Sequence, residues 1–296
     1  MLTTDLPLGA HQSIAGGTPR AVERGIDAGG RVLQIFVKNN ARWLGKAIPK
    51  SEARQFRVAV RNAGLSHVAA HASYLINLAS PSAALRRRSA EALRDEILRC
   101  ADLGIRDLVL HPGSHGGDGE ARGVDRISAE LRQVLEETAE TRVRILLETA
   151  AGQGAAVGHR FEHLRDILAR VVGRRIGICV DTCHVHAAGY ELSTAEGYSR
   201  TWRAFAEAIG LPRLHAIHVN DSKTPLGSRV DRHEHIGRGS IGLAGFRQLM
   251  TDPLLATVPK FLETPKDPAR DFDRLNLARL RRLAASARRN PGAIAP

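Results

Sequence analysis

Short apolar runs alternate with amphipathic stretches along nearly the whole chain, and this alternation is the feature that most restricts its fold. Each run is too short for a helix, and most runs contain β-branched residues, so each is predicted to form a strand. The predicted strands cover residues 6–10, 32–37, 68–70, 108–110, 143–147, 176–180, 214–219 and 260–262.

The stretches between these strands have apolar residues at helical spacing. Thr18 followed by Pro19 predicts an N-cap and a helix start, and residues 193–196 form a Ser-x-x-Glu capping box. Further helices are predicted at 83–103, 161–171, 243–250 and 275–287.

Eight strands that alternate with helices fit an α/β fold, a (β/α)8 TIM barrel. A doubly wound open sheet is the alternative, but no Gly-x-Gly-x-x-Gly motif follows the first strand. We expect one catalytic domain over residues 1–287 and a frayed tail over residues 288–296.

Composition excludes several classes of protein. No stretch approaches the ~20 apolar residues of a membrane span, and the N-terminus has no signal-peptide pattern. Three cysteines are too few for a disulfide framework, so a cytoplasmic protein is expected, and we expect a monomer. The net charge of +12 favours a polyanionic partner, although an arginine-rich composition also fits the codon bias of a GC-rich genome.

Histidine and acidic residues lie at the ends of most of the predicted strands. They are His71, His111, Glu148, Asp181, His218 and Glu263, and His184 follows Asp181 by three residues. In a barrel these strand ends meet at one rim, where the active site lies. Clustered carboxylates repel one another at low dielectric, and a mixture of imidazoles and carboxylates is typical of zinc, manganese or iron sites. The sequence therefore predicts a metal site at the C-terminal rim.

A second group of polar residues follows the seventh strand. In an extended segment, Asp231, His233 and His235 would share a face. Asp231 and His233 bring the candidate ligands to nine, and one zinc ion takes only three or four protein ligands. Two or three metal ions are therefore expected, a cluster that suits hydrolysis of phosphodiesters.

Several motifs together resemble the endonuclease IV family of zinc-dependent apurinic/apyrimidinic-site DNA endonucleases. The most specific are Asp-Thr-Cys-His at 181–184 and Arg-x-Asp-Arg-His at 229–233. Other matching segments are 9–17, 34–40, 71–78, 110–115, 147–154, 218–223, 227–239 and 262–264.

The resemblance implies three zinc sites and a DNA repair reaction. One zinc would bind His71, His111 and Glu148. A second would share Glu148 and add Asp181, His218 and Glu263. A third would bind His184, Asp231 and His233. The enzyme would hydrolyse the phosphodiester 5′ to an abasic site in duplex DNA, leaving a 3′-hydroxyl and a 5′-deoxyribose phosphate, with Glu148, Glu263 and Asp181 as its catalytic carboxylates.

The resemblance also implies how DNA would be bound. Tyr74 and Leu75 match residues that the family inserts into the minor groove of bent DNA, a step that requires unstacking. Ala41 stands where many members have an arginine that inserts into the DNA, so Arg42 is the candidate for that function.

Two other functions remain open from the sequence. A sugar isomerase or epimerase of the xylose-isomerase-like barrels would use one or two metals, so the third ligand group distinguishes the endonuclease from it. A DNA-binding protein without catalysis would have no need for nine ligands. Manganese suits the same ligands as zinc and is the alternative ion.

Overall fold

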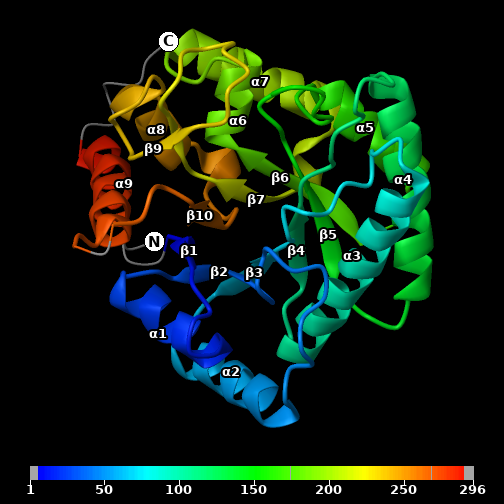
Figure 1. Ribbon diagram of the computed structural model, residues 1–296. Helices are drawn as coiled ribbons and strands as arrows, with labels where there is room; N and C mark the ends of the chain where they lie inside the picture. Colours follow the sequence, from blue (N-terminus) through cyan, green and yellow to red (C-terminus); the bar gives the residue numbers. More distant parts are fainter. Residues whose placement is uncertain (1–5, 174, 268, 290–296) are drawn as a thin grey trace.

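Eight parallel strands close into a barrel in the computed structural model, which describes residues 6–173, 175–267 and 269–289 (Figure 1). Around the barrel the hydrogen-bonded order is β1, β10, β7, β6, β5, β4, β3 and β2. Their bounds are β1 Leu8–Gln12, β2 Val32–Phe36, β3 His67–His71, β4 Asp107–Leu110, β5 Arg144–Glu148, β6 Ile176–Asp181, β7 Leu214–His218 and β10 Lys260–Leu262. The predicted (β/α)8 barrel is confirmed, and the open-sheet alternative is wrong.

Helices follow the strands and cover the outside of the barrel (Figure 1). They are α1 Thr18–Asp27, α2 Lys50–Asn62, α3 Ala83–Leu103, α4 Glu120–Glu137, α5 Phe161–Arg170, α6 Thr182–Ala188, α7 Ala195–Ala208, α8 Gly242–Thr251 and α9 Phe272–Arg289. Two 3-10 turns, η2 Leu211–Arg213 and η3 Pro253–Leu255, precede β7 and β10. Within the described ranges, no helix is long and apolar enough to cross a membrane.

Two helix starts differ from the prediction by one residue. Thr18 is the first residue of α1 rather than its cap, and its hydroxyl donates to Glu52 Oε1 of α2 at 3.0 Å. At α7 the cap is Thr194, whose Oγ1 accepts a hydrogen bond from the Gly197 amide at 3.1 Å. Ser193, the expected cap, instead donates its hydroxyl hydrogen to a nearby carboxylate. A tertiary contact and a competing local hydrogen bond therefore moved both starts.

The C-terminal helix is longer than the sequence pattern indicates. α9 begins at Phe272 and ends at Arg289, whereas apolar spacing predicts only 275–287. The first two residues of the tail predicted to fray, 288 and 289, therefore belong to this helix. Residues 290–296 lie outside the described residues.

Two layers of apolar side chains fill the molecule. Alternate residues of the strands point into the barrel, where a compact buried cluster lies below the C-terminal rim. Its members are Val32, Ala69, Val109, Leu146, Cys179, Ala216 and Phe261. A larger cluster, which includes Leu33 and Ile35, packs the strands against the helices. Gly9 allows β1 and β2 to approach closely, because a Cβ there would lie 1.7 Å from the Val32 carbonyl oxygen.

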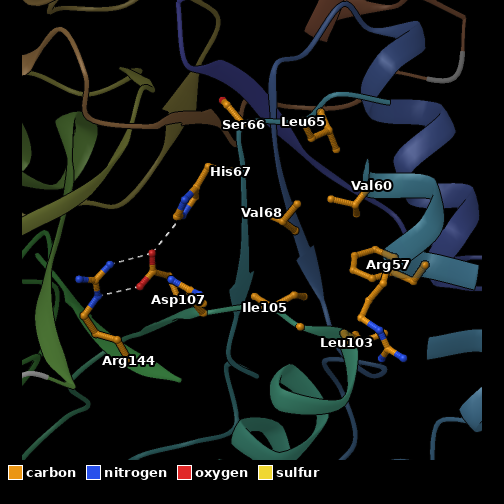
Figure 2. Close-up of a pocket in the computed structure, with 13 residues that line it drawn as sticks. Arg57, Val60, Leu65, Ser66, His67, Val68, Leu103, Ile105, Asp107 and Arg144 are labelled. Atoms are coloured by element: carbon orange, nitrogen blue, oxygen red, sulfur yellow. Dashed lines mark hydrogen bonds and ion pairs between the residues drawn. The ribbon is translucent and has the colours of Figure 1, made fainter. Parts of the chain in front are cut away.

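The N-terminal end of the barrel carries an ion network beside a cavity of 540 Å³ (Figure 2). Fully buried Asp107 accepts hydrogen bonds from Arg144 at 2.7 and 3.0 Å, and His67 Nε2 lies 3.0 Å from its Oδ2. The opposite side of the cavity is apolar and includes Val60 and Leu65. His67, Asp107 and Arg144 are the first residues of β3, β4 and β5, so the ion network lies at the end of the barrel opposite the predicted metal site.

Candidate metal centre

The candidate ligands gather at the C-terminal ends of the strands. His71, Glu148, Asp181 and His218 are the last residues of β3, β5, β6 and β7. His111 directly follows β4, and Glu263 directly follows β10. Asp181 and His218 are register partners on adjacent strands. Parallel strands in a closed barrel therefore bring residues far apart in the sequence into one space, as the sequence predicts.

The first group consists of His71, His111 and Glu148. The Nε2 atoms of both histidines lie 3.2 Å from Glu148 Oε2. His71 Nδ1 lies 2.7 Å from the Ala72 carbonyl oxygen, so Nδ1 carries a hydrogen and donates it there. This contact directs the other nitrogen of His71 toward Glu148, as in metal sites where a carbonyl orients a ligating histidine.

The second group consists of Glu148, Asp181, His218 and Glu263. His218 Nδ1 lies 2.8 Å from Glu148 Oε1, 3.2 Å from Glu263 Oε2 and 3.8 Å from Asp181 Oδ2. The side chain of Asn220 joins two of these residues. Its Nδ2 donates to Asp181 Oδ2 at 2.7 Å, and its Oδ1 accepts the Glu263 amide at 2.8 Å.

The third group consists of His184, Asp231 and His233. Asp231 lies 3.2 Å from His184 Nε2 and 3.4 Å from His233 Nε2. The Nδ1 atoms of both histidines face backbone carbonyls, Thr149 O at 2.8 Å and Glu263 O at 3.1 Å. His184 belongs to α6, which Asp181 caps by accepting the His184 amide at 2.9 Å.

The hairpin of β8 Asp221–Ser222 and β9 His233–Glu234 carries two members of the third group, Asp231 and His233, and fully buried Asp221 anchors it. Asp221 Oδ2 accepts amide hydrogens from Gly237 at 2.8 Å and Gly239 at 3.1 Å. Its Oδ1 accepts those of Ser222 at 2.9 Å and Ile241 at 3.0 Å, with Gly242 at 3.4 Å. The close approach requires glycine at 239, where a Cβ would lie 2.2 Å from the Ser222 carbonyl oxygen.

The imidazoles and carboxylates of the cluster shift one another's pKa values. Burial alone would raise the pKa of Glu148, but the imidazoles of His111 and His218 hold it well below its usual value. Burial alone would lower the pKa of His184, but the carboxylates of Asp181 and Asp231 hold it well above its usual value. Glu148 is therefore an anion in a buried place, where it needs a positive partner.

The cluster fits divalent metal ions. In each of the three groups the nitrogen and oxygen atoms lie within 4.8 Å of one another. His184 Nε2 and His233 Nε2 are enclosed, and neither has a hydrogen-bond partner among the described residues. Imidazole nitrogens and carboxylate oxygens in sets of three or four are the ligands that zinc takes. The chain thus has candidate metal-binding clusters that match the predicted ligand set.

Two further residues near the cluster are not among the predicted ligands. Cys183 lies within ligand distance of Asp181 and His233, burial raises the pKa of its thiol, and that thiol donates to the Arg232 carbonyl oxygen at 3.5 Å. His235, expected to share a face with His233, instead stacks on Phe272 of α9 at 4.0 Å.

The predicted DNA-contacting residues lie on two loops beside the cluster. Tyr74, in the loop after β3, is 63% exposed, and its ring lies 5.9 Å from that of His111. Leu75 is half-buried next to it, and Arg42 is exposed in the loop after β2. A buried ion pair joins the two loops. Lys38 Nζ lies 2.6 Å from Glu96 Oε1, and it donates to the Arg42 carbonyl oxygen, while Glu96 accepts the Ser73 amide.

Sequence reasoning missed the polar residues that position the candidate ligands. Gln34 and Asn220 are fully buried and hydrogen-bond to several of them. Both lie in segments that match family motifs, and a buried amide in an apolar strand is the signal that could have identified Gln34.

Comparison with known proteins identifies the family. A profile described as a xylose isomerase-like TIM barrel matches residues 22–287. A probable endonuclease 4 of Citrifermentans bemidjiense is 48% identical over 277 residues, which cover 93% of this chain and 98% of that protein. Endonuclease IV from Thermus thermophilus has a similar structure, with a TM-score of 0.84, 35% identity, and coverage of 95% of this chain and 99% of that chain.

A more distant neighbour shares only the fold. A D-tagatose 3-epimerase-like protein has a TM-score of 0.71 at 17% identity, covering 96% of this chain and 100% of that chain. The resemblance inferred from the motifs is confirmed by the closer relatives, as is the prediction of a nuclease. The chain belongs to the endonuclease IV family.

Proposed function

We propose that the protein hydrolyses the phosphodiester 5′ to an abasic site in duplex DNA, using three zinc ions and leaving a 3′-hydroxyl and a 5′-deoxyribose phosphate. The observation that carries the proposal is the set of three adjoining ligand groups, in which Glu148 belongs to two. We also propose that the protein acts as a cytoplasmic monomer on damaged or abasic DNA, with manganese as a substitute ion.

Four of the proposed ligands form the open side of the cluster. The side chains of Asp231, His111, His233 and Glu263 are 40%, 32%, 18% and 14% exposed. Glu148 and Asp181 are fully buried behind them. A phosphodiester would therefore enter past His111 and Asp231 and meet Glu263, while Glu148 and Asp181 hold the ligand groups together from below.

The cluster's own residues would arrange the reaction. Bound divalent cations would supply an activated water and neutralise charge on the phosphodiester oxygens. Asn220 fixes Asp181 and the backbone of Glu263 relative to each other, so these carboxylates keep their positions as the substrate binds. His71 and His184 are each oriented by a backbone carbonyl.

The rim has the side chains needed to hold a distorted duplex. Tyr74 presents an exposed ring beside His111, where it can stack on a base that flanks the abasic site. Leu75 would wedge between bases, and Arg42 would contact the backbone from the neighbouring loop. The net charge of +12 favours binding to phosphates.

Cleavage of a duplex with a single tetrahydrofuran abasic analogue tests the proposal, together with a count of bound metals. We expect three zinc ions per chain and incision on the 5′ side. Glu263→Gln should still bind the duplex but lose most cleavage, whereas Glu234→Gln, on the adjacent loop outside the three groups, should remain active. Fully metallated protein that leaves this duplex intact would refute the proposal.

The sugar isomerase or epimerase is the second candidate, because its fold relatives share the barrel. The third ligand group speaks against it, since isomerisation needs no third ion. One or two bound metals with turnover of a sugar would support this alternative. Metallated protein that binds DNA without cutting it would instead support a non-catalytic DNA-binding function.

A further inference from the structure

A buried glutamine on β2 connects both sides of the metal cluster. Gln34 is fully buried and points into the barrel at the level of the candidate ligands. Its Oε1 lies 2.8 Å from His218 Nε2, and its Nε2 lies 2.6 Å from Glu263 Oε1 and 3.1 Å from His11 Nδ1. One carboxamide thus contacts residues from β1, β7 and the segment after β10.

The glutamate fixes which way the carboxamide faces. Glu263 is a proposed metal ligand, and a carboxyl group that binds a metal ion is deprotonated, so it accepts hydrogen bonds and donates none. Only the amide nitrogen of Gln34 can therefore lie 2.6 Å from Glu263 Oε1. The reversed amide would place two oxygens in repulsive contact there. Gln34 Oε1 must consequently face His218.

This orientation determines where two histidines carry their hydrogens. An amide oxygen only accepts, so His218 donates from Nε2. In the neutral ring that metal binding requires, Nδ1 then has no hydrogen and can bind a metal ion. Nδ1 is the His218 atom that faces Glu148, Glu263 and Asp181. The amide NH2 donates to His11 Nδ1, so His11 carries its hydrogen on Nε2.

We propose that Gln34 is a positioning residue that holds His218 in its metal-binding tautomer and orients Glu263, and that His11 completes this arrangement. The inference rests on the proposed metal site. Gln34 is fully buried, so it would act through these neighbours and not on the substrate. It acts by keeping the second ligand group assembled, in the way that hydrogen-bond partners of metal ligands fix ring orientation and raise affinity.

Metal release from holoenzyme variants tests this inference. Gln34→Met keeps the length of the side chain but removes both hydrogen-bonding ends. The matched control is Gln12→Met, because Gln12 is also a buried glutamine, on β1, and donates to Asp273 at 2.7 Å outside the cluster. With zinc release to a chromophoric chelator as the readout, Gln34→Met should weaken zinc binding by about 10–100-fold, and Gln12→Met should not. Equal zinc affinity in Gln34→Met and wild type, or equal weakening in both variants, would overturn the inference.

A second measurement needs no substitution. In zinc-loaded wild-type protein labelled with 15N histidine, two-bond proton–nitrogen NMR correlations report which ring nitrogen carries hydrogen. We expect a hydrogen on Nε2 of both His218 and His11, and a hydrogen on Nδ1 of either would overturn the inference. Neither readout uses DNA. Wild-type protein with these tautomers that leaves abasic DNA intact would refute the proposed function and leave the inference about Gln34 standing.

Discussion

Replacing Asp221 with asparagine should release the hairpin that carries Asp231 and His233 of the third ligand group. The carboxylate of Asp221 accepts five backbone amides, and an asparagine of the same shape has only one acceptor oxygen. If that oxygen keeps the hydrogen bonds from the Ser222 and Ile241 amides, the new NH2 group faces the amides of Gly237 and Gly239. Two amides then lose their acceptor, at about 1–3 kcal/mol each. Because water reaches this loop, we expect a loss of about 2–4 kcal/mol in the free energy of unfolding.

The functional consequence should be local to one group. β8 pairs Asp221 with Glu234 and Ser222 with His233, so a loosened hairpin displaces His233 and the nearby Asp231. Asp221→Asn should therefore lose one zinc ion of three, measured by metal analysis after dialysis, with urea unfolding giving the stability. Asp271→Asn is the control, because exposed Asp271 accepts a single amide, from Arg274. Asp221→Asn protein with full metal content and wild-type stability would refute the reasoning.

Three further perturbations should have separable effects. Lys38→Met leaves buried Glu96 without its cation and should lower the free energy of unfolding in urea by about 3–5 kcal/mol. The Lys38→Met/Glu96→Leu double variant should recover most of that loss. Burial and Arg144 lower the pKa of His215 to about 4 from 6.5, so only the unfolded chain gains this proton as the pH falls between those values. Wild type should thus lose about 1–3 kcal/mol of stability from pH 6.5 to pH 4, and His215→Gln should lose less. Tyr74→Ala should weaken binding of abasic duplex by about 5–150-fold in a fluorescence titration, because one stacking contact is worth about 1–3 kcal/mol. Unchanged affinity would exclude Tyr74 from the interface.

The strands of the barrel were predictable because buried parallel strands are short apolar runs, and the structure adds only small changes at their ends. The rim residues were predictable for the same reason, since a polar residue that ends such a run can lie only at the C-terminal face. The helices α2 and α4 were not predicted. α2 buries few large side chains, since among its residues only Ala53 and Phe56 are buried. α4 buries Ile127, Leu131 and Val134 at helical spacing, a signal that could have identified it.

Contacts between distant segments were beyond sequence reasoning. Alternation along an extended segment predicts that His235 and His233 share a face. The chain instead turns after His235, where the Arg238 amide donates to the His235 carbonyl oxygen. α9 then supplies Phe272 as a stacking partner. The function of Gln34 likewise depends on partners near residues 11, 218 and 263, and no local pattern brings these together.

The closure of the barrel has a consequence for how the protein is made. The last strand, β10, pairs with β1 and β7, and Glu263 follows it directly. A nascent chain that has emerged only as far as β7 lacks Asp231, His233 and Glu263, and its sheet is still open. Its acidic and imidazole side chains then lie beside an unclosed edge, where nothing yet holds them in their final positions. Catalytic competence should consequently appear late in synthesis, in one step with the pairing of β1 and β10.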